Sequence, residues 1–547
     1  MRDFYLKHKP LIMLWLLCII ALIIFTGHYT NLLFDVGREV YYPERILEGK
    51  VLYKDLFVIY GPFSYLWNAL LYKIFSVNLG TLYFSGAVCS VGIVSGIYLI
   101  AKKFLNTSLS FAIAFFTVAT GVCSVNLFNF TFPYSQAMLY GTLSFLYSLY
   151  FLIKYKESGC TKFFYLSAFL AGLAAANKYE FVIYAGVLFV AALFTRNKTV
   201  ILNFITTFLA IPVICFGILF LQGLRLDHLI QAAHEISNLM NAETLKYFYL
   251  TQGVFFNPNA LPVWGISILK TGIPFAAILL SYGIYDKNKV LSVTLMTLCL
   301  ITAYFLCNPA VFVFLIPLLV IVSICCIKKF NGNINLLLLI LSALAVSLKS
   351  FWGLTPMNYG NYYVSIILIA FFGIFFLLID KKYQNPTAVF IVVIGLCFFN
   401  SNIYQRVYLT GKISSPHGTI YTFENQAQSA NEVLSELNNY EQGVRAFIYP
   451  EGLLLNFLSK NNIKSDDYYN SLLPLYEESM GERKFTENLN KAKPELVIFN
   501  NQSTKDYYYN YICTDYALNF YSAVQKDYEK INYIKGETSY MIYQRKK

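Results

Sequence analysis

Charged side chains that could transfer a proton or bind phosphate gather in the segment 28–60, directly after the first apolar run of the chain. Its candidate proton acceptors are Asp35, Glu39 and Asp55, since a positioned carboxylate can take or orient a proton. Arg38 is a candidate phosphate ligand, because cationic donors neutralise charge on phosphate oxygens. Other interpretations stay open: Asp35 could cap a helix that begins after it, Asp55 could pair with a neighbouring lysine, and Glu39 could be a solvated charge one helical turn from Asp35.

Three more charged residues lie beside or inside later apolar runs. Lys178 and Glu180 share the tight turn between two runs, where Lys178 could bind phosphate or the two could form a surface ion pair that ends a helix. Lys270 lies about seven residues, or roughly 10 Å, inside the outer end of its run. It could reach a phosphate at the membrane surface, or extend its ammonium group outward without any ligand.

The long loop 223–262 is the other charged segment between apolar runs. Arg225 stands near its start, where a guanidinium group could bind phosphate at the edge of the bilayer. His228 and His234 are six residues apart and cannot share one helix face well, so they predict no metal site. No cofactor is indicated with certainty, and a divalent metal stays an open alternative.

The composition shows what kind of chain must position these residues. Its 547 residues are 57% hydrophobic, 18% aromatic and only 13% charged, with a mean hydropathy of +0.53. Soluble proteins carry about a quarter charged residues. The composition therefore excludes a soluble enzyme, a disordered protein and a disulfide-rich secreted scaffold, and indicates a polytopic membrane protein.

Thirteen apolar runs are long enough to cross a bilayer as helices, with ends uncertain by several residues. They cover about 10–27, 81–101, 108–125, 135–153, 163–177, 181–195, 200–222, 263–284, 290–306, 309–327, 334–349, 363–379 and 387–403.

Basic residues recur in every second loop between these runs, which indicates the side of the membrane that each loop faces. The N-terminus and the loops expected on its side of the membrane hold sixteen Lys and Arg residues against four acidic residues. The loop 28–60, on the other side, holds four basic residues against five acidic ones. We therefore predict a cytoplasmic N-terminus in the inner membrane, with residues 404–547 outside the cytoplasm. The alternation requires 163–177 and 181–195 to be two separate spans. No cleavage site follows the first run, so we expect an uncleaved anchor.

The net charge of +12 follows from this membrane topology and does not indicate a nucleic-acid partner. Residues 404–547 hold sixteen basic and seventeen acidic residues, so the whole excess belongs to residues 1–403. Membrane lipids are the partners that this distribution implies.

Two stretches within residues 34–67 carry a family-like pattern after the acid that follows the first run. They read Arg45-Ile46-Leu47-Glu48-Gly49-Lys50-Val51-Leu52-Tyr53-Lys54-Asp55 and Tyr60-Gly61-Pro62-Phe63-Ser64-Tyr65. This pattern resembles the GT-C glycosyltransferases. More narrowly, it is similar to bacterial polyprenyl-phosphate-sugar transferases of the aminoarabinose and galacturonic acid transferase type, which are related to protein O-mannosyltransferases. The many-span plan with a soluble C-terminal domain is also similar.

The resemblance implies a GT-C-like transmembrane catalytic domain over 1–403. It would transfer a sugar, with inversion, from a polyprenyl-phosphate donor to a glycan, lipid or protein acceptor at the extracytoplasmic face. The first-loop acid of that family is the catalytic carboxylate and corresponds to Asp35, and Asp55 belongs to the same segment. A basic residue often follows a small-residue helix in similar sequences, as Lys178 does here. The other cations that could bind the lipid phosphate are Arg225, Lys270 and Arg38.

One departure from the family pattern concerns a second acid. Many GT-C enzymes carry it in the next outer loop, whereas residues 126–133 contain none. Asp55 or Glu180 would have to take that role, with Glu39 as a further acid, or the enzyme would work with one acid and no divalent metal.

Residues 404–547 are polar and rich in tyrosine, and they predict a small extracytoplasmic α/β domain. The expected helices are 424–437, one from Leu453, 482–489 and 516–528, and the expected strands are 444–449, 495–499, 531–534 and 540–543. The run Tyr449-Pro450-Glu451-Gly452 resembles the tail domains of some bacterial GT-C relatives. Without a convergent catalytic set, the domain is interpreted as a lid or an acceptor platform.

Two other functions are weighed against the transferase. A flippase or transporter of lipid-linked saccharides should show ionisable residues in its spans or duplicated halves, and neither is evident. An O-antigen polymerase or ligase usually has arginine-rich outer loops, whereas the outer loops here are balanced by acids. The transferase is therefore the preferred hypothesis.

Overall fold

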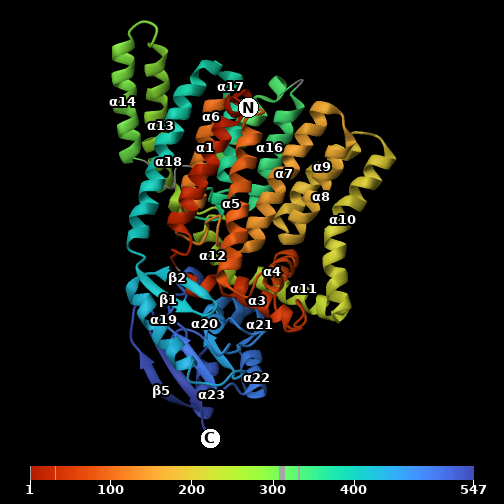
Figure 1. Ribbon diagram of the computed structural model, residues 1–547, viewed down its shortest axis with the longest axis vertical. Helices are drawn as coiled ribbons and strands as arrows, with labels where there is room; N and C mark the ends of the chain where they lie inside the picture. The colour runs from red at the N-terminus through yellow and green to blue at the C-terminus, as the bar shows by residue number, and fades with distance from the viewer. Residues whose placement is uncertain (1, 31, 307–314, 331–332) are drawn as a thin grey trace.

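The structure is a computed structural model that describes residues 2–30, 32–306, 315–330 and 333–547. A bundle of long helices forms one part of the molecule, and a C-terminal α/β domain packs against one end of the bundle (Figure 1). The N-terminus lies at the opposite end of the bundle from this domain. The predicted fold class is thereby confirmed.

Each of the thirteen predicted runs overlaps a helix, and the run 309–327 lies partly outside the described residues. The helices are α1 (Arg2–Phe25), α5 (Leu79–Ala101), α6 (Thr107–Thr117) with η1 (Val118–Val122), α7 (Gln136–Ser158), α8 (Thr161–Asn177), α9 (Glu180–Leu193), α10 (Lys198–Leu221), α13 (Leu261–Gly283), α14 (Lys289–Leu306), α15 (Leu315–Cys325), α16 (Ile334–Ser347), α17 (Val364–Leu378) and α18 (Gln384–Val407). Among the described residues, seven helices are long and apolar enough to span a membrane, and five further apolar helices are shorter. The number of thirteen crossings stays a prediction.

The loops between these helices alternate between the two ends of the bundle as the charge pattern indicated. The ammonium group of Lys103, after α5, lies 2.6 Å from the carboxylate of Glu157, near the end of α7. Lys381, before α18, lines the same pocket as Lys103. The short pair of runs forms two helices, α8 and α9, joined by a two-residue turn, which is what the alternation required.

The segment after α1 forms α2 (Leu32–Asp35) and α3 (Gly37–Leu47), followed by α4 (Phe63–Ile74). Gly49 follows the end of α3 with a φ of +89°, a left-handed backbone conformation that favours glycine and ends the helix. Ile46 and Leu47 with Val51 and Leu52 predict short amphipathic helices in the membrane interface. The structure shows that α3 is buried between α4 and the C-terminal domain. A Cβ atom on Gly37 would lie 2.7 Å from the Cβ of Leu453. The backbone of α3 therefore packs directly against the side chain of Leu453 in the C-terminal domain.

The C-terminal domain is built on a four-stranded sheet of order β3-β4-β6-β5. Its strands are β3 (Ala446–Tyr449), β4 (Leu496–Asn500), β5 (Tyr528–Ile534) and β6 (Tyr540–Arg545), and only β3 and β4 run parallel. Its helices are α19 (Glu424–Leu437), α20 (Leu453–Leu458), α21 (Pro474–Met480), α22 (Glu482–Ala492) and α23 (Leu518–Asp527). A hairpin that the sequence did not predict, β1 (Gly411–Ser415) with β2 (Gly418–Thr422), connects the domain to α18.

Charged groups and backbone pairing hold this domain against the segment 28–60. The guanidinium group of Arg45 donates two hydrogen bonds to the carboxylate of Asp467, at 2.7 and 2.9 Å. Lys50 lies 3.2 Å from the same carboxylate. On the hairpin side, the amide of Tyr421 donates to the carbonyl of Gly27 at 2.7 Å. The C-terminal domain is therefore docked by paired, mostly buried groups, a geometry that opposes movement as a free lid.

Replacing Arg45 tests this docking. In Arg45→Ala, Asp467 keeps only Lys50 as a cationic partner while it stays largely buried, so we expect a loss of stability of about 3 kcal/mol. Thermal unfolding in detergent and proteolysis at the junction measure the effect. The control is Arg483→Ala, which breaks an exposed pair with Glu487 on α22 and should cost well under 1 kcal/mol. Equal losses in the two variants would contradict the docking role.

Candidate functional site

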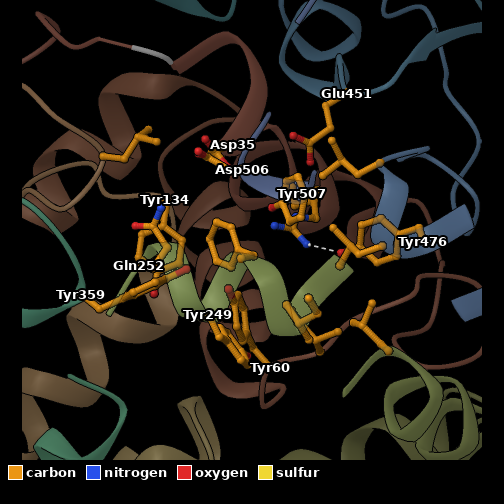
Figure 2. Close-up of a pocket in the computed structure, with 18 of the residues that line it drawn as sticks. Asp35, Tyr60, Tyr134, Tyr249, Gln252, Tyr359, Glu451, Tyr476, Asp506 and Tyr507 are labelled. Carbon is orange, nitrogen blue, oxygen red and sulfur yellow. Dashed lines mark hydrogen bonds between the residues drawn. The ribbon is translucent and has the colours of Figure 1, made fainter. Parts of the chain in front are cut away.

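A cavity of about 340 Å³ lies where the bundle meets the C-terminal domain (Figure 2). Every described outer loop of the predicted topology contributes to its wall, as does the C-terminal domain. The lining residues are Asp35, Arg38, Ile59, Tyr60, Leu127, Phe128, Tyr134, Tyr179, Lys349, Tyr359, six residues of α11 (Leu226–Asn241), α12 (Glu243–Thr251) and the position after α12, and Glu451, Leu473, Leu475, Tyr476, Gln502, Ser503, Asp506 and Tyr507. The site is therefore shared between the two parts of the molecule.

Asp35 faces this cavity from the last residue of α2 (Figure 2). Val36 is the N-cap of α3, and no side chain bonds to that helix end, so the interpretation of Asp35 as a helix cap is wrong. Within the described chain, the carboxylate of Asp35 has no hydrogen-bond donor and no ion-pair partner. Burial raises its pKa, Arg38 lowers it and Asp506 raises it again. A half-buried carboxylate that no protein group occupies is suited to accept a proton from a ligand.

Two cations line the cavity with Asp35. Arg38 lies one turn along α3 and donates from Nη1 to the hydroxyl of Tyr476 at 3.3 Å, the dashed line in Figure 2. Lys349, in η5 (Leu348–Ser350), lies 4.3 Å from the ring centre of Tyr359. The sequence did not single out Lys349, although a lone lysine at the end of the run 334–349 was a signal that could have found it.

Lys178 and Glu180 lie behind the cavity wall and not in it. The ammonium group of Lys178 donates to the hydroxyl of Tyr134 at 2.9 Å and lies 4.5 Å from the ring centre of Tyr60. Glu180 accepts from the hydroxyl of Tyr363 at 2.8 Å, and its carboxylate lies 3.1 Å from Lys349 and 3.8 Å from Lys178. The predicted pair exists, but it is buried instead of exposed, and it holds Lys349 in place.

The remaining predicted residues do not reach the cavity. Glu39 accepts from the hydroxyl of Tyr65 at 3.2 Å and from the amide of Gln136 at 2.8 Å, so its charge faces the N-terminus of α7. Burial raises the pKa of Glu39 to about 7, with the Gln136 amide opposing the shift. Asp55 accepts from the amide of Val51 at 2.9 Å and lines a separate surface pocket.

Arg225 and Lys270 are also separate from the cavity. Arg225 is exposed and pairs with Asp227, with 2.8 Å between nitrogen and oxygen. Lys270 lies exposed within α13. The structure thus brings together Asp35 and Arg38 of the predicted residues, and leaves phosphate binding by the other two cations without support.

The C-terminal domain contributes acids that the sequence did not identify as site residues. Glu451 follows β3, and Asp506 follows β4. Because these strands are parallel, their carboxyl ends meet at one edge of the sheet, and this edge faces the cavity. The run Tyr449-Pro450-Glu451-Gly452 was noticed, but nothing local indicated that it meets Asp35. Among the described residues, no three His, Cys, Asp or Glu side chains form a group that could hold a metal ion.

Comparison with known proteins shows which solved structures share this fold. No known family model and no curated protein sequence matches the chain. Among solved structures, ArnT from Cupriavidus metallidurans bound to undecaprenyl phosphate is similar with a TM-score of 0.52 and 11% identity, over 98% of each chain. The oligosaccharyltransferase AglB of Archaeoglobus fulgidus, in complex with an inhibitory peptide and a dolichol-phosphate, has a TM-score of 0.51 and 12% identity, over 100% of this chain and 75% of its own.

A second structure of the Archaeoglobus fulgidus oligosaccharyltransferase, in complex with zinc and sulfate, has a TM-score of 0.50 and 12% identity, over 98% of this chain and 73% of its own. These proteins are GT-C glycosyltransferases. The fold that the resemblance implied is therefore confirmed.

Replacing Gly61 tests the backbone packing that places Tyr60 in the cavity. Its amide donates to the carbonyl of Asn177 at 2.8 Å, and a Cβ atom there would lie 2.1 Å from the carbonyl oxygen of Ala176. We expect Gly61→Ala to lower stability by about 1–3 kcal/mol, since two backbones would have to separate. Gly217→Ala in α10 is the control, because nothing lies within 4 Å of its Cβ position. Thermal unfolding of both variants checks this, and an unaffected Gly61→Ala would show that the contact is loose.

Proposed function

We propose that this protein is a membrane glycosyltransferase that moves a sugar from a polyprenyl-phosphate donor to an acceptor hydroxyl group, with inversion. The observation that carries the proposal is the carboxylate of Asp35, which has no hydrogen-bond or ion-pair partner among the described residues and lies in a cavity that it shares with Arg38 and Lys349. The fold supports it, because solved proteins of this fold bind undecaprenyl phosphate or dolichol-phosphate.

The proposed reaction uses Asp35 as a general base. The acceptor oxygen attacks the anomeric carbon of the sugar, and its proton passes to the carboxylate of Asp35. The bond between the anomeric carbon and the phosphate oxygen breaks at the same time, and its electron pair stays on that oxygen. The products are the glycosylated acceptor and polyprenyl phosphate, and Asp35 returns its proton to water.

Arg38 and Lys349 are the proposed ligands of the donor phosphate. The only hydrogen bond of the Arg38 side chain in the described chain goes to Tyr476, which leaves donors of its guanidinium group for phosphate oxygens. Lys349 is held by Glu180, so its ammonium group is fixed at the wall before a ligand arrives. Fixed cations stabilise charge that develops on the leaving oxygen without further rearrangement.

An apolar groove supports a donor with a lipid tail. It has a volume of about 570 Å³ and lies between α9 and α16. Its lining includes Ile183, Val190 and Leu341. The residues next to the outer ends of both helices, Tyr179 before α9 and Lys349 after α16, line the cavity. We propose that the isoprenoid chain of the donor occupies this groove while its phosphate lies in the cavity.

The decisive experiment is turnover of a panel of polyprenyl-phosphate sugars by the purified protein in lipid vesicles. Because the base is removed, we expect Asp35→Asn to lower kcat by about 10²- to 10⁴-fold. Asp227→Asn is the matched control, since Asp227 forms an exposed pair away from the cavity. Full activity in Asp35→Asn would refute the role of the base, and movement of lipid-linked sugar across the vesicle without transfer would favour a transporter.

We propose that the cavity and the C-terminal domain face the extracytoplasmic side, because the basic loops gather at the other end of the bundle. Tyr508 is 74% exposed in this domain, and the native Cys160 is exposed in the loop between α7 and α8. In intact cells, a membrane-impermeant thiol reagent should label the variant Tyr508→Cys and leave Cys160 unlabelled until the membrane is opened. The reverse pattern would invert the topology.

A further inference from the structure

The cavity holds more carboxylates than its cations can neutralise. Asp35, Glu451 and Asp506 line it, against Arg38 and Lys349. Lys349 is already paired with Glu180. Asp506 is exposed, so water solvates its charge. Arg38 is therefore the one cation left for the two more buried acids, Asp35 and Glu451.

Glu451 is the more enclosed of these two acids. It is 7% exposed, and its carboxylate has a neutral donor, the hydroxyl of Ser471 at 3.4 Å. Within the described chain it forms no ion pair. Its backbone is held by the side-chain amide of Asn500, which donates to the Glu451 carbonyl at 2.9 Å. A carboxylate in such surroundings is less costly as a neutral acid than as an anion.

The other charged and titratable groups around the two acids do not supply a second free cation. They are Arg38, Lys349, Tyr359, Tyr476, Asp506 and Tyr507. Burial raises the pKa of Glu451, Asp35 raises it further and Arg38 lowers it. Two carboxylates that share one cation lose their protons in separate steps.

We propose that Glu451 keeps its proton while Asp35 loses one, so that the bundle and the C-terminal domain together form a single acid–base pair. The inference rests on the proposed function and assigns a positioning role to the C-terminal domain. The neutral acid adds no negative charge beside the donor phosphate, and its hydroxyl group can donate a hydrogen bond to a sugar or phosphate oxygen. Glu451 itself transfers no proton to the substrate in the cycle.

Ionisation of Glu451 at higher pH would place a second negative charge beside Asp35 and repel the donor phosphate. The pH profile of kcat/KM of the wild type should therefore fall on both sides, with Asp35 protonated on the acid side and Glu451 ionised on the alkaline side. In Glu451→Gln, which keeps a neutral hydrogen-bond donor at this position, the alkaline fall of the profile should disappear. Replacing a residue with a purely structural role would leave the alkaline side of the pH profile unchanged. An inactive, folded Glu451→Gln, or one that keeps the alkaline fall, would overturn the inference.

Infrared difference spectroscopy during a pH titration tests the proton without any turnover. Both the wild type and Glu451→Gln keep any band of the buried Glu39. The difference between the two proteins should therefore isolate a carboxylic acid C=O band of Glu451 that persists above neutral pH. Glu487→Gln, which changes an exposed acid of the same domain, should keep it. Absence of the band in the wild type would refute the inference.

The two measurements also separate the inference from the function on which it rests. If the band is present and no donor is turned over, the transferase fails and the protonated state of Glu451 stands. If the donor is turned over and Glu451→Gln keeps the alkaline fall, the transferase stands and the role of Glu451 fails.

Discussion

The ion pair between Arg45 and Asp467 and the close contact of Gly37 with Leu453 are the constraints on which the site depends. They fix the C-terminal domain against α3, and α3 begins two residues after Asp35. The same docking turns the edge formed by β3 and β4 toward Asp35. Without it, the cavity would lose the wall that carries Glu451 and would open to water. Exclusion of water strengthens each charge interaction in the cavity, because the local dielectric constant falls.

The sequence predicted those parts of the molecule that local physics decides. Apolar length and the alternation of basic loops predicted the helices and the end of the bundle at which each loop lies, since both follow from transfer into a bilayer. The α/β character of residues 404–547 also followed from local pattern, and the predicted helix 424–437 is α19. Asp35 was predicted from its place after the first apolar run and from the family resemblance, and Arg38 as a nearby cation that could bind phosphate. What they face could not be predicted, because it is separated from them by hundreds of residues.

Some of the predicted site residues do not line the cavity, which shows the limit of reasoning from charge alone. Asp55 and Glu39 satisfy nearby amides, of Val51 and Gln136, and such bonds compete with any ligand for the carboxylate. An isolated acid in a sequence can serve a helix end or a substrate equally well. The site residue is recognised by its missing partner, which only tertiary structure reveals. Asp35 lines the cavity without a hydrogen-bond partner in the described chain, whereas Glu39 accepts from Tyr65 and Gln136.

The buried network behind the wall explains how a cation can be kept ready beside acids. Glu180 lies between Lys178 and Lys349 and also accepts from Tyr363. Two cations therefore share one carboxylate, so part of their positive charge is directed toward the tyrosine ring faces and the cavity. An incoming phosphate would complete the neutralisation that Glu180 leaves unfinished. If Glu451 is neutral, as proposed, its carboxyl group cancels none of this positive charge, and the charge is the electrostatic basis that we propose for recognising a phosphate-linked donor.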